Sequence, residues 1–149
     1  EATFEKADLR GMDLRLIRIR GASFANALMS YTILIGMDLM GVYFRGADLS
    51  EADLREATVE GTTFREATLR NANLSGLDMH GICFANADLS GADLSGANLS
   101  GADLTDANLS GANLRGANLD DAEIKGANFE GTAMPVRQRL SRWIGGKRR

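Results

Sequence analysis

The sequence predicts an all-β solenoid, and two periodicities support this prediction. Residues 86–119 repeat a five-residue unit in which Ala precedes Asp or Asn, then Leu, then Ser, Thr or Arg, and usually Gly. The same frame extends without an insertion from a central residue at Phe4 to one at Met134, which makes 27 units at one every five residues. A fixed short period is the signature of a repeat architecture.

The second periodicity is longer and sets the number of sides in each coil. Phenylalanine recurs every twenty residues at the central position, and the resulting core ladder consists of Phe4, Phe24, Phe44, Phe64 and Phe84. Four units per turn would stack these rings above one another at about 4.8 Å per coil. The sequence therefore predicts a quadrilateral β-helix of nearly seven 20-residue coils.

A period of five excludes the regular alternatives. On a helix, successive central residues would advance by about 500° and form no apolar stripe. In a long strand, side chains alternate with period two, and five is odd. Read instead as a three-residue strand, Ala–Asp–Leu points Ala and Leu inward and Asp outward. The next two residues, typically Ser–Gly, then turn the chain, because Gly accepts positive φ at little steric cost.

The repeated pattern A(D/N)LxG, found throughout residues 2–134, resembles that of the pentapeptide-repeat protein family. The resemblance covers about nine tenths of the chain. It implies a right-handed winding, which the periodicity alone does not establish. We expect two regions, a β-helix over residues 1–134 and a C-terminal segment over residues 135–149.

The C-terminal segment has a different pattern. Pro135 is followed by apolar residues at helical spacing, namely Val136, Leu140, Trp143 and Ile144. We expect a short capping helix here, since an open solenoid end exposes apolar core and unpaired backbone. The alternative is a basic amphipathic anchor for an acidic surface or a membrane.

The second coil and its edge, residues 28–43, break the rule that outward positions are polar. By the register, Leu28, Tyr31, Ile33, Ile35, Met40 and Tyr43 lie at outward or corner positions. A contiguous exposed apolar patch commonly marks an interface, so these six residues form the candidate interaction site. A covering N-terminal segment and a local distortion of the coil remain as alternatives.

Other candidate sites are weaker. Arg10, Arg15, Arg18 and Arg20 crowd the first coil, where they could bind phosphate or carboxylate groups or pair with neighbouring Asp residues. His80 and Cys83 lack the further ligands that zinc needs, and Cys83 lacks a nearby base that would activate it. We therefore expect no metal site, no cofactor and no catalytic residue, and hence no enzyme.

Charge separates the two regions. Residues 1–134 contain 11 Lys and Arg against 20 Asp and Glu, a net charge of −9, and residues 135–149 add six basic residues to give −3. An acidic rod is compatible with DNA mimicry, as in pentapeptide-repeat proteins that act on DNA gyrase or topoisomerase. This chain lacks the inter-coil loop and the Phe-rich repeats of that group. A carboxylated surface also keeps a repeat rod in solution.

The preferred interpretation is a non-catalytic protein–protein interaction scaffold that binds on its outer wall. The expected partner is another protein or a second copy of the chain, with homodimerisation through the second coil, and nucleic acid is not expected. The alternatives are a gyrase-directed DNA mimic and the repeat domain of a larger secreted effector. No apolar run is long enough for a transmembrane helix, and one cysteine excludes an internal disulfide, so we expect a cytoplasmic protein.

Overall fold

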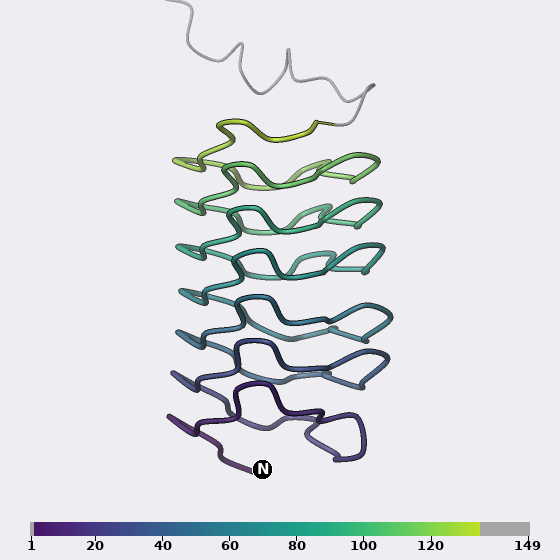
Figure 1. Ribbon diagram of the computed structural model, residues 1–149. Coiled ribbons are helices and arrows are strands. Elements are labelled where there is room, and N and C mark those ends of the chain that lie inside the picture. Colours follow the sequence, from purple (N-terminus) through teal and green to yellow (C-terminus); the bar gives the residue numbers. More distant parts are fainter. Residues whose placement is uncertain (1, 135–149) are drawn as a thin grey trace, which may run out of the picture.

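The computed structural model describes residues 2–134, and these residues form a stack of four-sided coils (Figure 1). Neighbouring coils pair through parallel β-bridges between residues twenty apart. The bridged residues define four walls, numbered in chain order. Wall 1 contains Thr3, Ser23, Tyr43, Thr63, Cys83, Asp103 and Glu123. Wall 2 contains Asp8, Leu28, Asp48, Thr68, Asp88, Asn108 and Asn128. Wall 3 contains Asp13, Ile33, Asp53, Asn73, Asp93, Asn113 and Ala133. Wall 4 contains Asp38, Thr58, Asp78, Asn98 and Asn118.

Each bridge involves a single residue, so the prediction of three-residue strands was wrong. Within residues 2–134 there is no multi-residue strand and no helix. The hydrogen bonds show the reason. The Tyr43 N–H donates to the Ala22 carbonyl of the preceding coil at 3.0 Å, and the Phe44 N–H donates to Thr63 of the following coil at 2.9 Å. The chain then turns at once, which leaves room for one bridged residue per side.

The corners are tight turns that explain the glycine of the repeat. The Ala47 N–H donates to the Phe44 carbonyl at 3.0 Å and closes a turn whose third residue, Gly46, has φ of +68°. A positive φ at this place is the requirement of a type II turn, which Gly meets without strain and Asn meets more readily than most residues. Asn71 has φ of +54° at an equivalent corner.

The acidic or amide residue of the repeat also has a structural role. The Asp48 carboxylate accepts a hydrogen bond from the Ser50 N–H at 3.0 Å, and Asp93 does the same for Ser95 at 3.0 Å. This side-chain-to-backbone bond begins the turn, which is why Asp and Asn are favoured there. In the later coils, Asn side chains also bond to the residue one coil below, as Asn98 does to Asp78 at 2.9 Å.

The core is a narrow column filled by the central and the Ala positions of each unit. The rings of the core ladder stack face to face, with centroid separations of 4.8 Å, 5.5 Å, 5.3 Å and 5.2 Å from Phe4 to Phe84. Phe24, Phe44, Phe64 and Phe84 are fully buried, whereas Phe4 in the first coil is only half buried. Stacked rings of this kind add about 0.5–1.5 kcal/mol per pair beyond simple burial.

The bridging is interrupted at two places, both on wall 4. Within the described residues, position 18 does not bridge to Asp38, and Thr58 does not bridge to Asp78. At the second place the amides of Val59 and Gly61 also lack the inter-coil bonds that other coils make. The coils spread there on the right-hand side of Figure 1.

Both interruptions adjoin a long side chain at a position that is usually Ala. Met37 occupies it in one case and Leu77 in the other, and both side chains are buried. The Leu77 N–H reaches the Leu74 carbonyl at 3.4 Å, a longer separation than in the neighbouring turns. We attribute the gaps to these side chains, which need more depth than a 4.8 Å coil spacing provides. The predicted C-terminal cap of Val136, Leu140, Trp143 and Ile144 lies outside the described residues.

Candidate protein-docking surface

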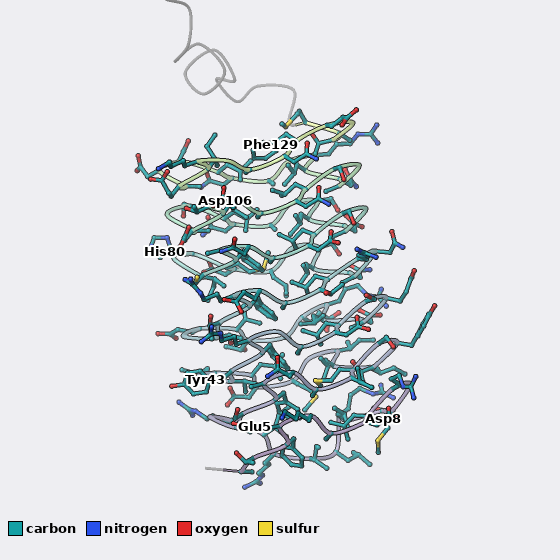
Figure 2. All side chains as sticks on the ribbon, turned by 90° about the vertical axis from the view of Figure 1, so that its left-hand side faces the viewer. Glu5, Asp8, Tyr43, His80, Asp106 and Phe129 are labelled. Atoms are coloured by element: carbon teal, nitrogen blue, oxygen red, sulfur yellow. The ribbon has the colours of Figure 1, made fainter. Side chains whose placement is uncertain are left out.

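The six predicted interface residues do not form one patch. Leu28 lies on wall 2, Tyr31 on the corner between walls 2 and 3, and Ile33 on wall 3, where Ile35 follows two residues later. Met40 follows wall 4, and Tyr43 lies on wall 1, which is opposite wall 3. Figure 2 labels Tyr43 away from Asp8 of wall 2. The prediction of a single contiguous patch was therefore too broad, and we use the name apolar band for Leu28, Tyr31, Ile33 and Ile35.

Within the apolar band, Leu28 and Tyr31 are exposed to solvent, whereas the two isoleucines are partly buried. Leu28 is 41% exposed and Tyr31 is 65% exposed. Ile33 and Ile35 are half buried. The band therefore offers an aromatic ring and an aliphatic side chain for contact, with two half-buried isoleucines beside them.

Ion pairs border the band on wall 3. One coil before it, Arg15 and Asp13 form a two-pronged pair, with Nη2 to Oδ2 at 2.7 Å and Nε to Oδ1 at 2.9 Å. One coil after it, Arg55 and Asp53 form the same pair at 2.7 Å. The bridges from Asp13 to Ile33 and from Ile33 to Asp53 place the three levels in one column. An apolar centre with a charged rim is the usual anatomy of a protein-binding site.

These pairs shift the titration of their carboxylates. The hydrogen bond from the Arg15 guanidinium holds the pKa of Asp13 at about 2, well below its ordinary value of 3.8. The bond from Arg55 likewise lowers the pKa of Asp53. Both carboxylates are therefore ionised at neutral pH, and the rim presents full charges of both signs.

The Ile33 side chain cannot accept the hydrogen bond that Asp13 and Asp53 accept at the same position of the adjacent coils. Asp13 accepts the Arg15 N–H at 3.1 Å, and Asp53 accepts the Arg55 N–H at 3.2 Å. Ile33 has no side-chain acceptor, so the N–H of Ile35 lacks the bond that begins the turn in the coils on either side. A hydrogen bond of this kind contributes about 0.5–1.5 kcal/mol. The apolar side chain is therefore not the choice that the turn favours.

Tyr31 also occupies a position that does not suit it. Its φ is +61°, and it is the only aromatic residue with a positive φ among residues 2–134. The equivalent corners one coil away hold Gly11, at φ of +68°, and Glu51, at φ of +59°. Among the described residues, nine other non-Gly residues share this corner conformation, and Tyr31 alone places an aromatic ring there. Tyr31 thus projects an aromatic ring from a corner at the edge of wall 3.

One exposed residue near the band was not among the predicted interface residues. Leu16 follows Arg15 at the far edge of wall 3 and is 98% exposed. Its corner position, where Gly is usual, was the available signal in the sequence. Met12 and Ile17 are 47% and 44% exposed, but they occupy inward positions of the first described coil, so their exposure reflects the end of the stack.

The other candidate residues have ordinary structural partners. Arg10 pairs with Asp8 at 2.7 Å, and Arg20 lies 3.8 Å from Asp38. The His80 Nδ1 lies 3.0 Å from the Ser100 hydroxyl oxygen. The half-buried Cys83 thiol donates to Asp103 at 3.7 Å. No group of three or more potential metal ligands occurs in the described part of the chain.

Comparisons with known proteins agree on the family. The family model described as pentapeptide repeats, with 8 copies, matches residues 18–46, 47–84, 82–121 and 97–134. A pentapeptide repeat protein from the Arabidopsis thaliana thylakoid lumen is 31% identical over 91% of this chain and 76% of its own, with a TM-score of 0.35. Rfr23, a pentapeptide repeat protein from the cyanobacterium Cyanothece 51142, is 27% identical over 89% and 88%, with a TM-score of 0.35.

A third solved structure is full-length QnrB1, described as a plasmid-mediated fluoroquinolone resistance protein. It is 22% identical over 96% of this chain and 95% of its own, with a TM-score of 0.38. Among curated proteins there is no significant match. In residues 2–134 we find no helix of the length and apolarity that crossing a membrane requires.

Proposed function

The chain belongs to the pentapeptide-repeat family, and from this premise we propose that it is a non-catalytic scaffold that docks a protein partner through the apolar band. The observation that carries the proposal is the replacement of an Asp–Arg pair by Ile33 and Ile35 between two coils that retain the pair. Wall 3 folds with Asp and Arg at these positions in the coils on both sides. The isoleucines are therefore explained by contact with a partner better than by folding.

Two further features support the same surface. Leu28 stands on wall 2 between Asp8 and Asp48, so a second wall also exchanges a carboxylate for an aliphatic side chain at this level. Tyr31 joins the two walls from a corner with positive φ. Tyrosine supplies a large, rigid contact area and is enriched in protein interfaces. The band thus combines an aromatic anchor with aliphatic neighbours and a charged border.

The test is a pair of double variants on the same wall. I33D/I35R gives the band the residues of the adjacent coils, and we expect it to fold with an unchanged or higher unfolding midpoint. N73D/S75R introduces the same ion pair two coils further along wall 3 and serves as the matched control. Immobilised wild type and N73D/S75R should capture the same protein from the native host, and I33D/I35R should not.

The captured protein is then purified and its affinity for all three forms is measured. We expect I33D/I35R to weaken binding at least tenfold and N73D/S75R to leave it within about twofold. A partner that binds I33D/I35R as tightly as wild type would contradict the proposal. Loss of binding by N73D/S75R alone would move the docking surface to the C-terminal part of wall 3.

The second candidate, a DNA mimic that acts on gyrase or topoisomerase, has less support on these walls. Its basis is the excess of carboxylates in residues 1–134. Several of these carboxylates are paired with Arg, including Asp8, Asp13, Asp53 and Asp88, and paired carboxylates resemble a phosphate backbone less than free ones. A gyrase supercoiling assay separates the two candidates, since a scaffold of another partner leaves supercoiling unchanged.

We also infer, from family membership, that the solenoid winds right-handed in nearly seven coils, and, from the single cysteine, that it acts in the cytoplasm, where structural disulfides are rare. The bridge columns on walls 1, 2 and 3, each with seven residues, support the coil number. An experimental structure would test the winding, and localisation of a tagged full-length protein would test the compartment.

A further inference from the structure

Building on the proposed docking role, we propose that the partner of the apolar band is a second copy of this chain, packed wall 3 against wall 3 with a twofold axis parallel to the solenoid axis. A homodimer about a twofold axis uses the same patch on both copies, so the patch must be self-complementary. Wall 3 meets this requirement in one orientation.

Wall 3 presents two outward columns of side chains. One is the bridge column that contains Asp13, Ile33 and Asp53. The other lies two residues later, at the start of the turn that leaves the wall, and contains Arg15, Ile35 and Arg55. A twofold axis parallel to the rod and midway between these columns exchanges one column for the other. It leaves every coil at its own level.

This exchange brings opposite charges together on both sides of the apolar centre. Asp13 faces the partner's Arg15, and Asp53 faces the partner's Arg55. Between these levels, Ile33 faces the partner's Ile35. Each ion pair of one copy thus completes an alternating four-charge cluster with that of the other. Complementary charges at an interface chiefly set its register and exclude wrong arrangements.

The remaining levels contain no clash of charge on the two columns. Asp93 faces the partner's Ser95, and in the sixth coil Asn113 faces the partner's Arg115. Tyr31, on the corner before wall 3, lies outside the two exchanged columns and borders the contact.

The alternative twofold axis, perpendicular to the rod, gives an unfavourable arrangement. It preserves the columns and inverts the order of the coils around Ile33. Asp13 would then face the partner's Asp53, and Arg15 would face the partner's Arg55. Like charges directly opposite one another are destabilising. The charge pattern therefore selects the parallel arrangement.

The size of the contact sets the expected affinity. The apolar centre and its two flanking levels span three coils at about 4.8 Å each. An interface built around them is smaller than the roughly 800 Å² per partner of a standard protein complex. We therefore expect a dissociation constant in the micromolar range, so the dimer must be sought at protein concentrations up to about 1 mM.

The first experiment measures association by sedimentation equilibrium of the full chain. Wild type should associate with increasing concentration. I33D/I35D places like charges opposite one another and should remain monomeric, at an unfolding midpoint close to that of wild type. Y43T, on the opposite wall, is the control and should associate as wild type does.

The second experiment determines the orientation by disulfide trapping in a C83S background. In the parallel dimer, residue 33 faces residue 35 of the other copy. A mixture of I33C and I35C should therefore form an intermolecular disulfide faster than either variant alone. Faster trapping of I33C alone would indicate inverted coils around Ile33 and would overturn the parallel arrangement.

The outcomes separate this inference from the proposed function. A wild type that is monomeric at 1 mM overturns the homodimer, and capture of a different protein by wild type but not by I33D/I35R would then still support the docking role. Association of I33D/I35D with wild-type affinity overturns the inference as well, because the dimer would lie elsewhere.

Discussion

Replacing Phe44 by Ala tests the core register most directly. The ring of Phe44 is fully buried and lies between Phe24, at a centroid distance of 5.5 Å, and Phe64, at 5.3 Å. Backbone bonds hold the wall on both sides, with the Phe44 N–H at 2.9 Å from Thr63 and the Tyr43 N–H at 3.0 Å from Ala22. The wall cannot move inward without breaking this pairing, so the cavity left by the ring should persist.

The expected destabilisation follows from this geometry. Phe→Ala substitutions in cores cost about 3–5 kcal/mol, and sites that cannot collapse lie at the upper end of that range. Phe4 provides an internal comparison, since its ring is only half buried and stacks on one neighbour at 4.8 Å. We expect Phe4→Ala to cost about half as much, roughly 1.5–2.5 kcal/mol. Asp93→Ala, which removes wall hydrogen bonds, should cost about 0.5–1.5 kcal/mol.

The assay is urea unfolding of the three variants and wild type, followed by circular dichroism. With an m-value of about 2 kcal/mol/M, a loss of about 4 kcal/mol moves the midpoint by about 2 M. Repeat rods can unfold in parts, so the order of the midpoints is the primary result. Equal midpoints for Phe44→Ala and Asp93→Ala would refute the register. A Phe4→Ala midpoint as low as that of Phe44→Ala would refute the role of double stacking.

Two further predictions concern the walls. The Asp13 carboxyl should titrate with a pKa of about 2 by carbon NMR, and Arg15→Gln should raise this pKa towards 3.8. Because the pKa is lower in the folded state than in the unfolded state, the stability that this pair contributes is present above about pH 3.8. It is lost as the pH falls towards 2. The amides of Val59 and Gly61, which make no inter-coil bond, should exchange hydrogen faster than those of Met79 and Gly81, which bond to the next coil at 2.8 Å and 3.0 Å. Leu77→Ala should slow the exchange of the Val59 and Gly61 amides, because the two coils could then pair at wall 4.

The fold could be read from the sequence because every coil depends on the same few requirements. Inward positions at Ala and Leu, a turn-starting Asp or Asn and a Gly corner each recur at a fixed phase, and the phenylalanine period sets four sides. These requirements are local, and a repeat solenoid propagates them by contacts between neighbouring coils only. The extent of pairing was missed, since the pattern alone does not show that the turn follows the bridged residue at once.

The gaps on wall 4 could not be predicted in the same way. Met37 and Leu77 satisfy the rule that this position is apolar, as Ala does. Whether a larger side chain fits depends on the depth available between two coils, which is a property of the packed structure. Ile82 stands at the equivalent position of wall 1, where the bridge from Thr63 to Cys83 remains intact. Whether the bridge forms therefore depends both on the branching of the side chain and on the wall that carries it.

The candidate site was found in the sequence as a set of residues, but its shape required the walls. Periodicity placed both Ile33 and Tyr43 outward, yet four-sided winding puts these residues, ten positions apart, on opposite faces. The structure also supplies the stronger argument for the band. Because the turn favours an acceptor at position 33 and a glycine at position 31, Ile33 and Tyr31 each replace a residue that the fold would prefer. A repeat makes such exceptions measurable against the coils on either side, and an exception that folding disfavours is best explained by contact outside the chain.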